Sequence, residues 1–434
     1  MMKAIINSRI YDFNQFIDNG FVIFDDKIIE IGSMKTFKDH GYEIIDGNNH
    51  LVMPGLVTGH THIYSTFARG MSVPFHPQNF QEILDQLWWK LDRNLDLETI
   101  YYSGIVSAVD HMKNGVTTLI DHHASGIDIL GSLDTLKKAV CENAHLRGVF
   151  AFETSDRFPV DKAIKENVDF YKENNSPFTK GLFGLHASMS LSEDTLIKVK
   201  KALGDMPIHI HVAESVLDEK DCRIKYQESI LKRLERHGLL NPKSIIAHGI
   251  YIDDEELKII KKHDCVIAVN FSSNLNNSVG VPPLRKFREL GIPVIIGNDG
   301  ISSAMTTEYL SLYYATHLID QTPNLFGLDE LKKMIHDSYD FVNHTLGIKI
   351  GKIEKGYEAD LLMIPYIPPT PMNTDNALGH LFFGLFHSFK PKNVYVSGRN
   401  VVKDYQIENK LEDTYKDASK VAQKLWDRIN KEVK

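Results

Sequence analysis

The feature that most constrains the fold of this chain is an alternation, through its middle, of short apolar segments with longer amphipathic ones. Eight apolar segments have the pattern of strands: residues 56–62, 116–122, 148–153, 181–186, 208–213, 244–248, 265–270 and 293–298. Helical patterns lie between several of them, at residues 129–144, 161–174, 193–203, 224–237, 254–262 and 284–290. Alternating strands and helices indicate an α/β fold with a parallel sheet, and eight such units predict a closed (β/α)8 TIM barrel. A doubly wound open sheet is the alternative, but no glycine-rich phosphate turn follows the first strand.

The two ends of the chain have a different pattern, in which short β-rich segments are separated by turn residues. These segments are residues 3–8, 20–25, 27–31, 358–364 and 392–399. They predict one small β-sandwich domain built from both termini, residues 1–53 and 352–404, beside a barrel domain of residues 54–351. The remaining stretch, residues 405–434, contains a charged amphipathic helix over 413–431, which we expect to pack on the surface.

Composition argues against several functional classes. The 434 residues carry a formal net charge of −8 and no basic block, which disfavours a nucleic-acid partner. The three cysteines are scattered, so they indicate neither a disulfide framework nor a thiolate metal site. The N-terminus lacks the apolar core of a secretion signal, and the apolar stretch at residues 378–389 is far shorter than the ~20 residues that span a bilayer. We therefore expect a cytoplasmic protein with a small-molecule substrate and no membrane partner.

Polar side chains gather where the predicted strands end, which is the face on which barrel enzymes build their sites. The first strand ends with His60 and His62, and residues two apart in a strand face the same way, so both imidazoles point into the barrel mouth. Later strand ends supply residues of the same kind: His209, His211 and Glu214 at the fifth, His248 at the sixth and Asp299 at the eighth.

Imidazole and carboxylate groups together suit Zn²⁺ or Fe²⁺, and an open coordination position suits catalysis. A single His-X-His motif is weak support for a metal site. The same motif combined with further histidines and an aspartate is stronger, because apolar strands that end repeatedly in buried polar groups are costly without a partner. We predict one divalent transition metal per chain, Zn²⁺ first and Fe²⁺ as the alternative.

The chain resembles the amidohydrolase superfamily, in its cytosine/guanine/S-adenosylhomocysteine deaminase and chlorohydrolase branch. The motifs that carry this resemblance are Met53 to His62, His211-Val212-Ala213-Glu214, His248, Asn298-Asp299-Gly300 and the segment 351–362. A narrower likeness is to the SsnA-type aminohydrolases, a group associated with purine catabolism. It is carried by residues 79–92, 120–125 and 153–157 and by Ser273-Asn274.

The resemblance implies roles for individual residues. Four would bind the metal: His60, His62, His211 and Asp299. Three would be catalytic: Glu214 as proton shuttle, His248 orienting the water or the new oxygen, and Asp299 as base. Four are candidates for substrate binding: His186, Glu153, Arg157 and Asn274. For Glu153 and Arg157 the alternative is a surface salt-bridge cluster.

Two departures from the family pattern bear on the reaction. The run before Ser273-Asn274 lacks the His-Asn-Pro of many purine deaminases, so substrate contacts there differ. The fourth strand ends in His186 and no lysine stands at its mouth, which favours one metal over a lysine-bridged pair.

These observations predict a metal-dependent aminohydrolase that deaminates a purine-like or pyrimidine-like heterocycle through an activated water. Hydrolysis of a cyclic amide or ureide C–N bond is the alternative within the fold. A non-catalytic metal-binding or ligand-binding protein is the alternative from another functional class. That alternative predicts that at least one metal ligand or the proton shuttle is missing, but the sequence retains all of them. By analogy with the family, we expect a homo-oligomer, a dimer or larger.

Overall fold

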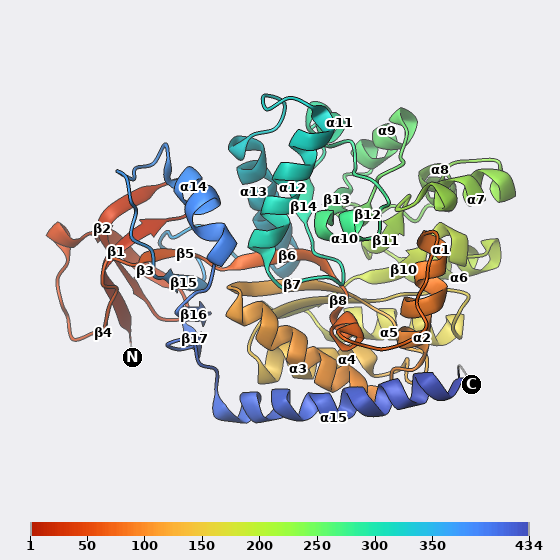
Figure 1. The fold of residues 1–434 in the computed structure, drawn as a ribbon, viewed down its shortest axis with the longest axis horizontal. Coiled ribbons are helices and arrows are strands. Elements are labelled where there is room, and N and C mark those ends of the chain that lie inside the picture. The colour runs from red at the N-terminus through yellow and green to blue at the C-terminus, as the bar shows by residue number, and fades with distance from the viewer. Residues whose placement is uncertain (1, 433–434) are drawn as a thin grey trace.

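The computed structural model describes residues 2–432. Residues 1, 433 and 434, at the outer limits of the predicted terminal segments, lie outside this range. The middle of the chain forms a barrel of parallel strands surrounded by helices (Figure 1). Its strands are β6 (Leu56–Thr61), β7 (Val116–His123), β8 (Arg147–Phe152), β9 (Thr179–Gly181), β10 (Phe183–Ala187), β11 (Ile208–Val212), β12 (Ile245–His248), β13 (Val266–Val269) and β14 (Val294–Ile296).

The barrel closes at two seams between its sheets. One sheet has the order β6-β7-β8-β9 and the other β10-β11-β12-β13-β14, with every neighbouring pair parallel. Parallel bridges join them, Thr154 to Leu185 on one side and Thr61 to Asp299 on the other. Strands β9 and β10 are separated by Leu182 and together fill one barrel position, so the predicted eight-stranded barrel is confirmed. The barrel strands are covered on both faces, which explains why their sequences are nearly continuous apolar runs.

Helices cover the outside of the barrel (Figure 1). They are α3 (Leu97–Lys113), α4 (Ser132–Lys137), η4 (Lys138–Asn143), α5 (Val160–Glu173), η5 (Ser188–Ser190), α6 (Glu193–Leu203), α7 (Val216–Tyr226), α8 (Ile230–Arg236), α9 (Asp254–Lys262), α10 (Phe271–Asn276), α11 (Leu284–Glu289), α12 (Met305–Asp320) and α13 (Leu328–Leu346). The single helix predicted over 224–237 is wrong. Gln227, with a left-handed φ of 60°, ends α7, and α8 begins after Ser229.

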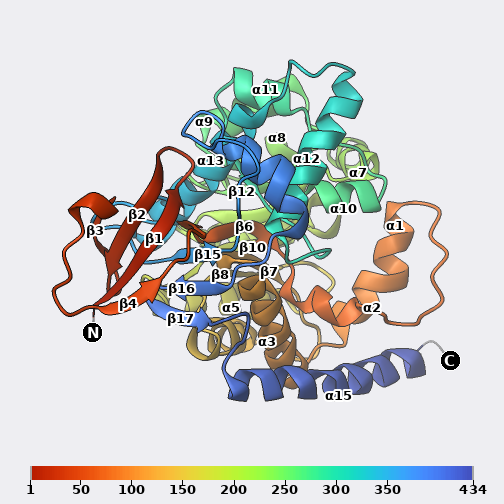
Figure 2. The same cartoon turned by 60° about the vertical axis from the view of Figure 1, so that its left-hand side comes forward.

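Both termini contribute to a separate, mostly antiparallel sheet (Figure 2). Its strands are β1 (Lys3–Tyr11), β2 (Phe16–Phe24), β3 (Ile28–Ser33), β4 (Glu43–Asp46), β5 (Leu51–Pro54), β15 (Leu361–Ile364), β16 (Asn393–Val396) and β17 (Arg399–Val402). The two ends of the chain meet where β5 pairs with β15 in antiparallel register, Leu361 opposite Pro54 and Ile364 opposite Leu51. The short helices η1 (Met34–Thr36), α14 (Ala377–Gly379), η6 (His380–Leu385) and η7 (Phe386–Ser388) connect its strands.

A buried ion cluster ties this sheet to the barrel. The guanidinium of Arg147, at the start of β8, is fully buried and lies 2.9 Å from a carboxylate oxygen of Glu358 and 3.0 Å from one of Asp360. Arg147 also donates to the carbonyl of Pro177 at 2.7 Å. A buried charge is tolerated only when it is paired and hydrogen-bonded, so this arrangement fixes the orientation of the sheet against the barrel.

The chain ends in a long helix, α15 (Asn409–Glu432), that packs along α3 (Figure 1). Ala418, Val421, Leu425 and Ile429 form its buried stripe at helical spacing. The indole of Trp426 donates to the carbonyl of Phe67 at 2.7 Å. Between residues 2 and 432, no helix is both long enough and apolar enough to cross a bilayer.

Candidate metal and catalytic site

Strands β6 and β11 bring their histidine pairs to one end of the barrel. His60 and His62 alternate with Thr61, and His209 and His211 alternate with Ile210, so each pair faces the barrel interior. All four are at least nine-tenths buried. The structure thus places the two histidine pairs at the same end of the barrel.

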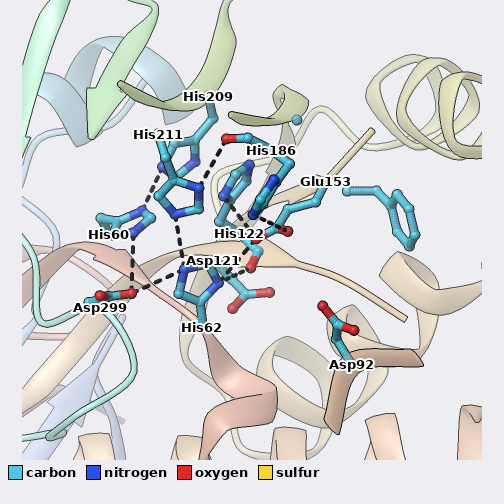
Figure 3. A network of polar contacts seen from close by, with 12 residues as sticks. His60, His62, Asp92, Asp121, His122, Glu153, His186, His209, His211 and Asp299 are labelled. Atoms are coloured by element: carbon cyan, nitrogen blue, oxygen red, sulfur yellow. Dashed lines mark hydrogen bonds and ion pairs between the residues drawn. The ribbon is translucent and has the colours of Figure 1, made fainter. Parts of the chain in front are cut away.

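Four predicted residues converge on one point (Figure 3). The Nε2 atom of His62 lies 3.1 Å from Nε2 of His211 and 3.1 Å from Oδ1 of Asp299. The Nε2 atom of His60 lies 3.7 Å from the same carboxylate oxygen. One ligand atom from each of His60, His62, His211 and Asp299 falls within 4.8 Å of the others, a set that could hold one metal ion.

The outer nitrogen of each imidazole in this cluster has its own hydrogen-bond partner. Nδ1 of His62 donates to the carbonyl of His122 at 2.6 Å, and Nδ1 of His211 to that of His186 at 3.0 Å. Nδ1 of His60 lies 2.8 Å from Nε2 of His209. Such contacts fix the ring orientation of metal-binding histidines and leave Nε2 free. The buried Nε2 of His60 has no hydrogen-bond partner in the described chain, so the residues present fit a divalent metal.

The charge states of His60, His211 and Asp299 also suit a metal. Burial lowers the pKa of His60 to about 4 and that of His211 well below the ordinary histidine range, which keeps both imidazoles neutral. Burial opposes ionisation of Asp299, but its close contacts with the rings of His60 and His62 hold its pKa well below the ordinary range. Neutral imidazoles and an ionised carboxylate are the forms in which these side chains bind metals. Burial lowers the pKa of His62, but the neighbouring Asp299 carboxylate raises it to about 9, so this ring would release a proton when a metal binds.

Glu214 and His248 stand beside this cluster. Nε2 of His248 lies 3.6 Å from Oε2 of Glu214, and both residues lie with Asp299 inside a second group spanning 4.8 Å. The Nδ1 atom of His248 lies 3.0 Å from Oδ1 of Asn274, whose side chain is fully buried. Burial raises the pKa of Glu214 well above the ordinary carboxyl range, so this group can hold a proton at neutral pH.

Two connected cavities open at this end of the barrel. The inner cavity, of about 70 Å³, is lined by residues that include Tyr64, Trp88, Trp89, Asp92, Glu153, His186 and Glu214. The outer cavity, of about 850 Å³, is lined by residues that include Arg69, Phe75, Trp88, His111, Tyr251 and Ile301. His62 and Asp299 line both cavities, so the clustered donors face the space that a substrate would enter.

The four predicted substrate-binding residues separate into two pairs. Glu153 and His186 line the inner cavity. Arg157 instead forms an ion pair with Asp92 at 2.6 Å, with its guanidinium 4.6 Å from the ring centre of Trp89. Asn274 lies behind His248 and lines neither cavity. These positions favour an indirect role for Arg157 and Asn274.

Several residues of the site were not predicted from the sequence. Tyr64, Trp88 and Asp92 line the inner cavity and belong to the long connection between β6 and α3. That connection contains η2 (Ile63–Ala68), α1 (Phe80–Ile83), η3 (Leu84–Trp88) and α2 (Trp89–Arg93). Asp121 accepts a hydrogen bond from the backbone of Ile63 at 2.7 Å, directly after His62. The polar run from Asp121 to His123, at the end of β7, was the available signal for it.

Comparison with known proteins finds relatives that match this chain over most of its length. The chain is 30% identical over 421 residues to a 5-methylthioadenosine/S-adenosylhomocysteine deaminase of Pyrococcus furiosus, covering 89% of this chain and 95% of that protein. It is 28% identical to a 5'-deoxyadenosine deaminase of Methanocaldococcus jannaschii, covering 88% and 90%. A crystal structure of an adenosine deaminase from Xanthomonas campestris with bound zinc superimposes with a TM-score of 0.83 at 18% identity, covering 99% of this chain and 98% of that one.

These matches define a class of enzyme, the metal-dependent hydrolases of carbon–nitrogen bonds outside peptides. The sequence profile of the amidohydrolase family matches residues 51–401, and the chain belongs to that family.

Proposed function

We propose that this protein is a zinc-dependent deaminase of a purine-like heterocycle. The observation that carries the proposal is the grouping of Glu214, His248 and Asp299 within 4.8 Å at the edge of the metal-binding cluster. The names of the relatives support a purine as the substrate class, and the zinc in the adenosine deaminase structure supports that metal.

His60, His62, His211 and Asp299 would hold the metal. When bound, a divalent ion there supplies Lewis acidity, which lowers the pKa of a coordinated water from 15.7 toward ~7. The fixed Nδ1 contacts of the three imidazoles keep their Nε2 atoms directed at this position.

The carboxylates divide the proton transfers between them. Asp299, held ionised by its histidine contacts, accepts a proton from the attacking water. Glu214, whose pKa burial raises, delivers a proton to a ring nitrogen and makes the neighbouring carbon more electrophilic. Two carboxyl groups in different environments thus take the base and acid roles.

His248 completes the arrangement. Its Nδ1 contact with Asn274 orients the ring so that Nε2 faces Glu214. From there it can stabilise charge on the attacking oxygen. Water adds to the amino-bearing carbon, the C–N bond breaks, and the products are the oxo heterocycle and ammonia.

The test is ammonia release from a panel of aminopurines and aminopyrimidines, assayed on protein of measured metal content. We expect turnover that disappears when a chelator removes the metal and returns when Zn²⁺ is restored. A fully metallated protein that releases ammonia from none of these compounds would overturn the proposal. Cyclic amides and ureides belong in the same panel, because ring opening without ammonia release would establish the other hydrolytic reaction.

A further inference from the structure

One face of the molecule away from the active site exposes several large apolar side chains. Tyr314, Leu318 and Ile319 belong to helix α12, on the outside of the barrel (Figure 1), and Leu318 is 78% exposed. Phe383, in η6, is 62% exposed, and Ile367, in the connection after β15, is 86% exposed. None of these five residues lines either cavity, so the proposed reaction gives no reason for their exposure.

Aromatic contacts join α12 to η6. The ring centre of Phe382 lies 5.9 Å from that of Tyr314 and 5.0 Å from that of Phe383. The hydroxyl of Tyr366, in the connection after β15, lies 3.0 Å from Nδ1 of His380 at the start of η6. The exposed side chains therefore belong to one face, which we call the α12–η6 face and define by Tyr314, Leu318, Ile319, Ile367 and Phe383.

The segments that form this face carry almost no charge. The sequence has no Asp, Glu, Lys or Arg from residue 309 to 319, and Asp375 is the only one from 361 to 389, although such residues make up 24% of the chain. The exposed residues of α9, by comparison, are all acidic or basic. Aromatic residues without charged neighbours are typical of the core of a protein–protein interface. A membrane surface is a poorer match, because helices that lie on membranes combine an apolar face with Lys and Arg.

The size of the face is also that of an interaction site. Side chains of these kinds, exposed to this extent, present on the order of 500 Å² of apolar surface. Patches of this size are among the largest on soluble monomers and are often functional. With a surrounding polar rim, the face would approach the ~800 Å² that each partner buries in a stable interface.

We propose that the α12–η6 face binds the same face of a second copy of this chain across a two-fold axis. In such a contact each residue near the axis meets its own copy, so acidic or basic residues there would repel one another. Two chains of net charge −8 repel each other, and an uncharged face is where this repulsion is least. Homodimer interfaces are also more apolar than those of partners that exist apart. This contact would account for the homo-oligomer expected from the sequence, and it does not depend on the deaminase function.

The first test is the mass of the metal-loaded wild-type protein in solution. Sedimentation velocity at micromolar concentration should give twice the chain mass of 49.4 kDa, or an even multiple of it. A protein that sediments as a single chain would overturn the proposal and would leave a different protein as the occupant of the face.

The second test places a charge on the face. Leu318→Glu and Phe383→Glu each put carboxylates into the contact from both copies, and we expect each to raise the dissociation constant of the dimer at least about 100-fold. Both side chains are exposed, so thermal melting and metal content should match wild type. Ile197→Glu is the matched control, because Ile197 is an exposed apolar residue of α6 that stands among charged residues. A dimer that survives both face variants, or that is lost equally in the control, would overturn the proposal.

The third test distinguishes a two-fold contact from binding to a different surface. Leu318→Lys should be monomeric alone, like Leu318→Glu. An equimolar mixture of the two variants should form mixed dimers, because opposite charges then face each other across the axis. Folded variants that stay monomeric in the mixture would overturn the two-fold contact.

Hydrogen exchange on the wild-type protein checks the same contact without a substitution. Peptides from α12 and η6 should exchange more slowly in the dimer than after dilution below its dissociation constant, while peptides from α9 should not change. Protection confined to other elements would place the interface elsewhere and overturn the proposal.

Discussion

The Nε2 atom of His62 lies 3.1 Å from the Oδ1 atom of Asp299, so the strands on either side of one barrel seam present polar groups to a single point. The same nitrogen is 3.1 Å from Nε2 of His211, at the far side of the barrel mouth. The cluster therefore forms only when the barrel closes. Metal binding and barrel stability should be linked, because a metal that binds only the folded chain stabilises it.

Asp299→Asn should lose both metal and activity. The change removes the charged member of the proposed ligand set and the proposed base together, while a hydrogen bond from Ser273 to position 299 can remain. Metal analysis after dialysis, with thermal melting as the control for folding, checks this. Retention of one full equivalent of metal would show that Asp299 is not a required ligand.

Glu214→Gln should keep the metal and lose turnover. Glu214 lies next to His248 rather than among the three clustered imidazoles, so its replacement leaves the proposed ligands intact. We expect kcat to fall by roughly 10²–10⁴-fold, the usual contribution of a positioned acid or base. Steady-state kinetics and metal analysis on the same preparation are the measurement. Loss of metal to the extent seen in Asp299→Asn would make Glu214 a ligand, and near-normal kcat would move the acid role to another group.

The sequence predicted those parts of the molecule that depend on local pattern. Apolar strand segments that end near His60, His211 or Asp299 identified the barrel and the end of it that carries the polar residues. This was possible because side-chain alternation and the apolar runs of buried strands can be read directly from the sequence. Contacts between loops were not visible in this way. The pairing of Asp92 with Arg157 joins two connections that are distant in sequence, and nothing in the local pattern of either indicates the other. The placement of Asn274 behind His248 is of the same kind.

Arg157→Ala should destabilise the connection between β6 and α3. Asp92 is 1% exposed and both of its oxygens accept from Arg157, which also packs against Trp89. Removing the guanidinium leaves a buried carboxylate unpaired, at a cost of about 3 kcal/mol. Because Asp92 and Trp89 line the inner cavity, KM should rise as well.

The double variant Asp92→Asn, Arg157→Met separates the causes of this effect. It removes both charges and keeps much of the packing, so urea unfolding should show recovery of most of the lost free energy. A double variant as unstable as Arg157→Ala would assign the loss to packing against Trp89 instead. Unchanged stability and KM in Arg157→Ala itself would show that the ion pair has no structural role.

Glu308→Gln should remove a pH-dependent loss of stability. Burial raises the pKa of Glu308 from its ordinary value of 4.5 to about 7, although the carboxylate accepts a hydrogen bond from the backbone of Ser272 at 3.0 Å. Between these two pKa values the folded chain holds a proton that the unfolded chain has released. The free energy of unfolding contributed by this group therefore falls as the pH rises from about 4.5 to about 7 and is level above that. Glutamine can still accept the Ser272 hydrogen bond and does not ionise. The stability of the variant relative to wild type should rise across this window by on the order of a few kcal/mol.

Urea unfolding of metal-loaded protein between pH 4.5 and 8 measures the difference. Glu289→Gln, at an exposed pair with Arg285, serves as a control whose curve should run parallel to wild type. A constant difference between Glu308→Gln and wild type over the whole range would show that Glu308 ionises at its ordinary pKa.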